Sequence, residues 1–284
     1  ATNSSFTLPV DIGNNTTVLS GESIGFLNVT TYFRAVIQSG SCSNAVSSYV
    51  TITVGGTSIW NGTSWNVEPT GYSSLVFNDN FNSTASISGC SCTVNSGNVV
   101  INSGHNMTVG GSVAVNEGTL TFENNANLVQ TTNAQNTGAI SIKRKTEPLM
   151  RLDYVLWSAP VVGQQLQSFS AGTVANRFYT YSPSTNLYEV VASPSATNFT
   201  TGKGYLIRMS NWHPATPTIW QGTFTGVPNN GTVTIPVTNE TYNAIGNPYP
   251  STIDADAFIA QNNITEAIYL WRKSNNDANT SYAT

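Results

Sequence analysis

The residues that could perform hydrolytic chemistry are few and lie far apart in the sequence. Ser23 stands in Gly21-Glu22-Ser23-Ile24-Gly25, which has the Gly-x-Ser-x-Gly spacing of a nucleophile elbow, and Asp153 and His213 follow in the chain order of a hydrolase triad. That elbow works only on a strand-to-helix turn, and no helical pattern follows Gly25. The chain has 2 histidines, the other being His105, so a general base is scarce. A glycosidase pair among the acids stays open, but no pair stands out. We therefore expect no catalytic residues and no enzyme activity.

The residues that could bind a metal are Cys42, Cys90, Cys92, Asp254 and Asp256. In Cys90-Ser91-Cys92 the two thiols would share one face of a strand, near the upper limit of separation for a relaxed disulfide. The odd count leaves one thiol with no partner or with a partner outside this chain. A metal site would need a second Cys/His pair at ligand spacing, which is missing, so we predict buried small hydrophobic residues, with one bridge as an option. No metal and no cofactor are expected.

The charge of the chain is sparse and slightly negative. Charged residues make up 8%, against roughly 25% in typical soluble proteins, and the net charge is −4. The longest basic run is Lys143-Arg144-Lys145, which we interpret as solvated charges on an edge strand. Nucleic acid is therefore a poor partner. No apolar run approaches the roughly 18 residues of a membrane-spanning helix, so no membrane span is expected.

The stretch from Gly89 to Gln130 organises the rest of the chain. Short runs with apolar residues two apart indicate strands with one buried face, namely Val99 and Ile101, Met107 and Val109, Val113 and Val115, and Leu120 and Phe122. Turn clusters rich in Asn and Gly separate them about every seven residues. A single strand this short cannot bury its apolar face unless similar strands stack on it, so we predict a short β-solenoid or solenoid-like ladder. A tight antiparallel sandwich of the same strands is the alternative, because periodicity does not fix which strands pair.

The predicted fold class is all-β, in three parts. Residues 1–54 hold two strong alternating strands, 29–37 and 47–54, which resemble the last strands of bacterial immunoglobulin-like repeats. We expect these residues to be the C-terminal part of an Ig-like sandwich whose earlier strands lie upstream. Residues 55–135 form the β-solenoid-like module, and 131–138 is the predicted linker after it.

The solenoid-like module opens with a hairpin signal. Asn61-Gly62 suits a type I′ turn, in which both residues take positive φ, and it would bring Trp60 and Trp65 together. We favour these tryptophans as the cap of the repeat stack over a sugar-stacking role.

Residues 136–284 are predicted to form a β-sandwich or jelly-roll module with one short helix. The clearest strands are 154–158, 177–181, 204–209, 232–237 and 267–272. Ser251 would be the N-cap of the helix, and Asp254, three residues later, would form the second half of a capping box. Ile253, Ala257 and Phe258 would form the apolar stripe of the helix, and Asn262-Asn263 would end it. Asp254 and Asp256 then lie at the positive end of the helix dipole. A calcium site is the alternative.

The blocks TTYFRAVIQSGSC, IWNGTSW, CSCTVNSGNVVINSGHNMTV, RLDYVLWSAPV and, most specifically, NPYPSTIDADAF occur here in fixed order over nearly the whole chain. Together they resemble the C-terminal region of large surface proteins of gliding Bacteroidetes, of the Flavobacterium type, which the type IX secretion system exports. The resemblance implies an extracellular, cell-surface, non-enzymatic segment for adhesion or gliding motility, preceding a sorting domain. It implies the type IX machinery as a partner, with surface polysaccharide or other cell-surface proteins as further candidates.

The alternative function is a carbohydrate-binding accessory region of a secreted polysaccharide-degrading enzyme. Its candidate sugar platforms are Trp60, Trp65, Trp212 and Trp220.

Overall fold

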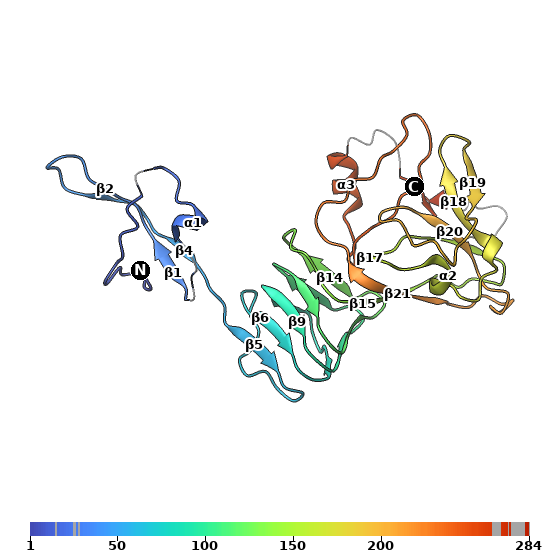
Figure 1. The fold of residues 1–284 in the computed structure, drawn as a ribbon, viewed down its shortest axis with the longest axis horizontal. Coiled ribbons are helices and arrows are strands. Elements are labelled where there is room, and N and C mark those ends of the chain that lie inside the picture. The colour runs from blue at the N-terminus through green and yellow to red at the C-terminus, as the bar shows by residue number, and fades with distance from the viewer. Residues whose placement is uncertain are drawn as a thin grey trace.

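The computed structural model describes residues 1–14, 16–24, 27, 29–262, 268–271, 273 and 282–283. Strand accounts for 34% of the structure and helix for 6%, which confirms the predicted all-β class. Figure 1 shows three parts in chain order: an N-terminal hairpin, a stack of short strands and a larger C-terminal part. A single hydrophobic core cluster extends from Leu75 in the strand stack to Phe224 in the C-terminal part, so these two parts are joined through their interiors.

The N-terminal part is an interrupted hairpin. Strand β1 (Thr31–Phe33) pairs antiparallel with β4 (Val50–Ile52), and β2 (Val36–Ile37) pairs with β3 (Ala45–Val46). The first predicted strand, 29–37, is therefore interrupted once, between β1 and β2, and the second, 47–54, is present only as β4. Between the two strand pairs, the Ser47 amide donates to the Ala35 carbonyl and the Ala35 amide donates to Ser47 Oγ. A one-turn helix, α1 (Gly21–Ile24), precedes them. Among the residues described in 1–54, none is buried.

This difference in burial leads to an expected pattern of hydrogen exchange. Amides of β1 and β4 are expected to exchange far faster than those of the strand stack, because backbone hydrogen bonds without buried apolar contacts open at little cost in free energy. Hydrogen–deuterium exchange followed by mass spectrometry would measure this. Protection in β1 and β4 equal to that in the strand stack would contradict it.

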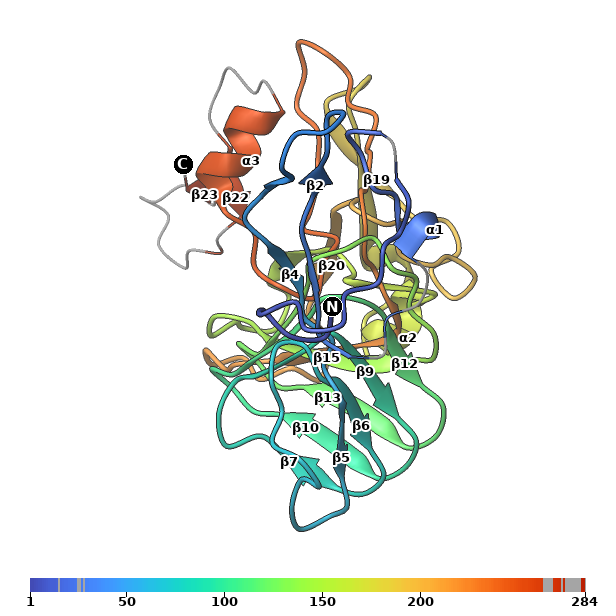
Figure 2. The ribbon, with the colours of Figure 1, turned by 90° about the vertical axis from the view of Figure 1, so that its left-hand side faces the viewer.

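The strand stack is a β-solenoid of about 4 turns. Its strands form three parallel rows, seen from the β5 end in Figure 2. The first row is β5 (Thr57–Trp60), β6 (Ser74–Phe77), β9 (Ser91–Val94) and β12 (Val113–Val115). The second is β7 (Phe81–Asn82), β10 (Asn98–Ile101), β13 (Thr119–Phe122) and β15 (Ile140–Lys145). The third is β8 (Ile87–Gly89), β11 (Asn106–Val109) and β14 (Asn127–Gln130). The parallel pairing rules out the antiparallel alternative.

The solenoid follows from the residue pattern within each coil. Of the eight apolar residues predicted to face inward, all but Val115 are buried. On the outside, side chains 21 residues apart bond across neighbouring coils, as Asn95 does with Asn116 and Asn106 with Asn127. Ladders of neutral side-chain amides therefore supply hydrogen-bonding groups on the outer surface, where most proteins carry charged side chains. The stack begins at β5, within the predicted module of residues 55–135 and before the regular stretch that starts at Gly89.

The C-terminal part closes the end of the solenoid. Strand β21 (Gln221–Pro228) pairs antiparallel with β15 and also with β17 (Val161–Val162), which makes one six-stranded sheet, β17-β21-β15-β13-β10-β7. Further contacts cover the last coil: the Leu128 amide donates to the Pro250 carbonyl, and the Asn136 side chain donates to the Pro228 carbonyl. These bonds satisfy backbone groups that would otherwise be exposed at the open end of a solenoid.

A second antiparallel sheet completes a sandwich-like module, as the sequence predicted. Its order is β16 (Tyr154–Trp157), β20 (Tyr205–Arg208), β18 (Phe178–Ser182) and β19 (Leu187–Val190). Between the sheets lie aromatic rings in edge or stacked contact, including Trp157, Phe169, Phe199, Tyr205 and Phe224. Phe169 ends the short helix α2 (Leu166–Phe169), and a 3-10 turn, η1 (Ala175–Arg177), leads into β18.

Two predictions about the join between these parts were wrong. Residues 131–138 do not form a linker, because Thr137 bonds through its backbone to Val113 and Val115 and so belongs to the last coil. The basic triplet 143–145 does not lie on an edge strand, because β15 lies between β13 and β21. Lys143 instead forms an ion pair with Glu123 at 2.6 Å, and only Lys145 is exposed.

Local details of the C-terminal part also differ from prediction. Residues 232–237 form no strand. Helix α3 is Ala255–Gln261, and Asp254 is its N-cap in place of Ser251: the Asp254 carboxylate accepts from the Ala257 amide at 2.9 Å. Its predicted end at Asn262 is confirmed, while Asn263 lies outside the described residues. The last predicted strand appears as β22 (Leu270–Trp271), paired with β23 (Tyr282–Ala283); positions 267 and 272 lie outside the described residues.

Candidate functional site

The residues of the candidate hydrolase triad each bond to other partners. Ser23 is exposed in α1, where its hydroxyl lies 3.0 Å from that of Ser20. The Asp153 carboxylate accepts from the Met150 amide and lies 3.5 Å from Lys273 Nζ. His213 Nε2 donates to the Leu149 carbonyl at 2.9 Å. Figure 1 places α1 and β20, the strand next to Asp153, in different parts of the molecule, so the structure does not bring the three together.

A serine–histidine contact that the sequence did not reveal lies inside the solenoid. Ser83 Oγ is 2.8 Å from His105 Nδ1, and it also accepts from the Asn102 amide at 2.9 Å. Ser83 is 2% exposed, so a substrate has no access to its hydroxyl. These bonds connect neighbouring coils at a turn, which gives His105 a structural role.

The three cysteines are free thiols in three different environments. Cys42 is exposed, Cys90 is half-buried with its Sγ 3.3 Å from Ser74 Oγ, and Cys92 is buried in the solenoid core. The prediction of a buried hydrophobic role is confirmed for Cys92 and wrong for Cys42. Burial raises the pKa of the Cys92 thiol from its usual 9.0 to about 12.

Thiol labelling would test this difference. At pH 8, iodoacetamide is expected to modify Cys42 readily and Cys92 only after unfolding, because a pKa of about 12 leaves a thiolate fraction roughly a thousand times below that of an ordinary cysteine. Below about pH 9 both states keep the proton, so the pKa difference leaves stability unchanged. Above it, only the unfolded thiol ionises, so stability falls towards pH 12 relative to Cys92→Ala. Labelling of native Cys92 as fast as Cys42 would contradict this.

Asp254 and Asp256, the two acids considered as calcium ligands, both lie where they stabilise helix α3. Asp254 caps α3, and Asp256 lies in its first turn, where a negative charge is favourable. Within the ranges that the structure describes, no group of three or more His, Cys, Asp or Glu side chains lies together in the manner of a metal site.

Three of the four tryptophans proposed as sugar platforms are packed into aromatic clusters. Trp60 and Trp65 meet edge-to-face at 5.5 Å between ring centroids and also contact Phe81, at the β5 end of the solenoid. Trp220 packs against Trp157 and Phe169. Trp212 differs, with 85% of its surface exposed.

The predicted hairpin between Trp60 and Trp65 is present, but its turn differs. Gly62 has a φ of +99° and Asn61 does not have a positive φ. The Asn61 side chain instead accepts from the amides of Thr63 and Ser64, so the loop is organised by a side chain and is not a type I′ turn.

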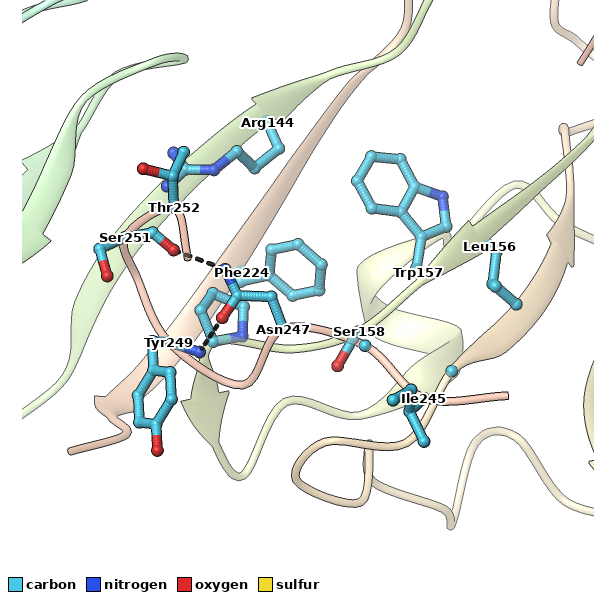
Figure 3. Close-up of a pocket in the computed structure, with 13 residues that line it drawn as sticks. Arg144, Leu156, Trp157, Ser158, Phe224, Ile245, Asn247, Tyr249, Ser251 and Thr252 are labelled. Atoms are coloured by element: carbon cyan, nitrogen blue, oxygen red, sulfur yellow. Dashed lines mark hydrogen bonds between the residues drawn. The ribbon is translucent and has the colours of Figure 1, made fainter. Parts of the chain in front are cut away.

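A pocket of about 260 Å³ lies where the last solenoid strand meets the C-terminal sheets. It is shown in Figure 3 and is lined by Arg144, Leu156, Trp157, Ser158, Pro160, Gly204, Phe224, Ile245, Gly246, Asn247, Tyr249, Ser251 and Thr252. Asn247 holds one wall of the pocket in a defined loop: its Oδ1 accepts from the Tyr249 amide at 2.9 Å, and its Nδ2 donates to the Ser251 carbonyl at 2.5 Å. The NPYPST sequence thus forms one side of the pocket.

The polar groups of this pocket are incompletely paired. Arg144 donates from Nη1 to the Lys143 carbonyl and from Nη2 to the Pro250 carbonyl. Burial lowers the pKa of Arg144, and among the described residues no carboxylate forms an ion pair with it. The Ser158 hydroxyl is buried and has no hydrogen-bond partner in the described part of the chain. From the sequence, the NPYPST block stands out only for its family resemblance, and Arg144 is predicted to be exposed to solvent.

Two family models match the chain. One is described as "Domain of unknown function (DUF8693)" and matches residues 30–284, which is most of the chain. The chain belongs to the DUF8693 family. A second, "Domain of unknown function (DUF8696)", matches residues 1–56 and ends directly before β5. The DUF8693 match includes the N-terminal hairpin, the solenoid and the pocket. No curated protein and no solved structure matches the sequence.

Among the described residues of this DUF8693-family chain, no helix is both long and apolar enough to cross a bilayer.

Proposed function

We propose that this chain is a non-enzymatic, extracellular segment of a cell-surface protein that serves adhesion or gliding motility. One observation carries the proposal: β15 is both the last strand of the solenoid and a central strand of the C-terminal sheet. The two modules therefore share hydrogen bonds and one core, and do not hang on a flexible tether. Such a continuous unit is suited to holding other parts of a surface protein at a fixed distance.

The proposed location and export route rest on the sequence resemblance. The NPYPSTIDADAF block resembles surface proteins that the type IX secretion system exports, and the same block forms a wall of the pocket and the start of α3. Outer ladders of neutral amides agree with a surface protein whose solubility does not depend on charge. Surface polysaccharide or another cell-surface protein is the proposed adhesion target.

Carbohydrate binding as part of a secreted enzyme is the second candidate, and exposed Trp212 favours it. An indole ring open to solvent can stack on a sugar ring. Glycan binding that is lost in Trp212→Ala and kept in Trp60→Ala would favour this candidate over adhesion by the whole segment.

Adhesion of coated beads would test the first candidate. Beads carrying the whole 284-residue chain are expected to attach to polysaccharide-coated surfaces under flow more often than beads carrying an unrelated β protein. Excess soluble chain should compete. Attachment no better than the unrelated protein, or turnover of ester substrates that Ser23→Ala abolishes, would overturn the proposal.

A further inference from the structure

Three tight turns meet at one end of the second sheet, where β16 begins and β20 ends. They are residues 150–153, 170–173 and 210–213, and we call them the turn cluster. In each turn the fourth amide donates to the first carbonyl. The Met209 amide donates to the Asp153 carbonyl at 2.7 Å, and the Arg151 amide donates to a carbonyl just after the third turn at 2.8 Å. These two bonds hold the first turn against the third.

The second turn also packs against the third. Thr173 Oγ1 donates to the Arg208 carbonyl at 2.6 Å. A β-carbon on Gly172 would lie 2.8 Å from Ser210 Cβ and 3.2 Å from Trp212 Cε3, so the backbone of the second turn lies against the indole ring. The three turns therefore form one continuous surface.

Large apolar side chains project from this surface into solvent. Trp212 is 85% exposed, Leu152 is 51% exposed, and Val174, directly after the second turn, is 41% exposed. Leu152 also has a φ of +79° at the third position of its turn, where a type II turn usually has Gly or Asn. A leucine that is held in a strained backbone conformation with half of its surface exposed indicates a contact outside the chain.

The charge at this surface is positive, although the whole chain has a net charge of −4. Arg151 is exposed in the first turn. Arg208 donates from Nη2 to Asn211 Oδ1 at 2.6 Å, so its guanidinium reaches the third turn. Arg177, directly before β18, lies opposite Arg208 of β20. Three arginines therefore surround the apolar side chains.

The turn cluster has no acid available to balance these arginines. Its one acid, Asp153, is 8% exposed, accepts from the Met150 amide and lies 3.5 Å from Lys273 Nζ. None of the three arginines forms an ion pair with another residue in the described part of the chain. An anionic partner would therefore complement the charge of this surface. Indole rings favour the interface of a lipid bilayer, and anionic lipids attract arginine.

We propose that the turn cluster docks on the surface of an anionic lipid bilayer. Trp212 and Leu152 would enter the boundary between head groups and acyl chains, and the arginines would bind lipid phosphates. A bilayer needs no matching hollow, which suits side chains that project from separate turns. A specific protein interface would need about 800 Å² of complementary surface on each partner, and a glycan that stacks on Trp212 would leave Leu152 without a partner. This inference does not depend on adhesion or gliding, because it rests on this surface alone.

Sedimentation with lipid vesicles would test the proposal. The whole 284-residue chain is expected to bind vesicles that mix phosphatidylcholine with phosphatidylglycerol. The affinity should be roughly 10- to 100-fold higher than for vesicles of phosphatidylcholine alone, because each arginine near an anionic surface adds to it. Added salt should weaken the binding, since it screens exposed charges.

Variants with matched controls assign the contacts. Trp212→Ala is expected to weaken binding to the mixed vesicles roughly tenfold or more. Leu152→Asn should weaken it roughly threefold to tenfold and leave the chain as stable as before, because asparagine tolerates a positive φ. Leu187→Asn changes a leucine that is 64% exposed at the opposite end of the sheet, and it should bind normally. Arg151→Gln should cost roughly fivefold, and Lys145→Gln, at an exposed position on β15, should cost nothing.

Four results would overturn the proposal. They are absence of vesicle binding by the folded chain, equal binding to vesicles with and without the anionic lipid, equal affinity of Leu152→Asn and Leu187→Asn, and binding to a soluble acidic polysaccharide or protein that replaces binding to vesicles. If Trp212→Ala fails to fold, the ratio between Leu152→Asn and Leu187→Asn still decides whether the turn cluster makes the contact.

Discussion

Replacing Phe122 by alanine is expected to lower the free energy of unfolding by about 3–5 kcal/mol. Phe122 is 0% exposed and lies in β13, where it pairs with Ile101 of the preceding coil and Ile142 of the following one. Strands in neighbouring coils are hydrogen-bonded at about 4.8 Å, so the coils cannot move together to fill the space left by the ring. The cavity cost therefore adds in full to the lost transfer free energy.

Urea unfolding followed by circular dichroism would measure the loss. Thr121→Ala is the matched control, because Thr121 is the neighbour of Phe122 in β13 and is only half-buried on the other face. The control should lose less than about 1 kcal/mol. A loss in Phe122→Ala no larger than in the control would mean that the solenoid interior is loosely packed, contrary to this structure.

The second large effect is expected at a glycine that the solenoid requires. Gly118 has a φ of +79°, and a β-carbon there would lie 2.3 Å from the Gly97 carbonyl oxygen in the coil before it. Gly118→Ala should therefore cost about 3 kcal/mol or more. About 1–2 kcal/mol comes from the left-handed backbone, and the rest from a clash that forces two hydrogen-bonded coils apart.

Gly104→Ala separates these two causes. Gly104 has nearly the same φ, +82°, but a β-carbon there meets nothing within 4 Å. This variant should lose only the backbone part, about 1–2 kcal/mol, in the same urea experiment. Equal losses at the two positions would show that the close approach of the coils at Gly118 does not constrain the stack.

Both expectations depend on how the solenoid is closed at its ends. The Trp60–Trp65 pair packs on Phe81 at the β5 end, and β21 covers β15 at the other. A repeat stack with open ends frays from them, because each coil contacts only its neighbours. Because both ends are covered, we expect the coils to unfold together. The loss of unfolding free energy at an interior position such as Phe122 then measures the stability of the whole stack.

Much of the fold could be predicted from local pattern. The two-residue apolar period and the Asn- and Gly-rich turns of 89–130 determined short strands with one buried face, and the structure places these strands in a solenoid. The main strands of the second sheet were also found, near 154, 178 and 205. These features depend on residues a few positions apart, and such spacing can be read directly from a sequence.

The pairing of distant segments was decided only by the tertiary structure. Arg144 belongs to a basic triplet that the sequence assigns to solvent, yet β21, about 80 positions later, makes β15 a central strand. Pro250, 106 positions from Arg144, then places a carbonyl on its guanidinium. Alternation along a strand tells which side chains share a face, and it carries no information about which strand lies next to it. The sequence alone therefore determined the short strands and their buried faces, and the pairing of strands decided the parallel coils, the cap, the shared core and the pocket.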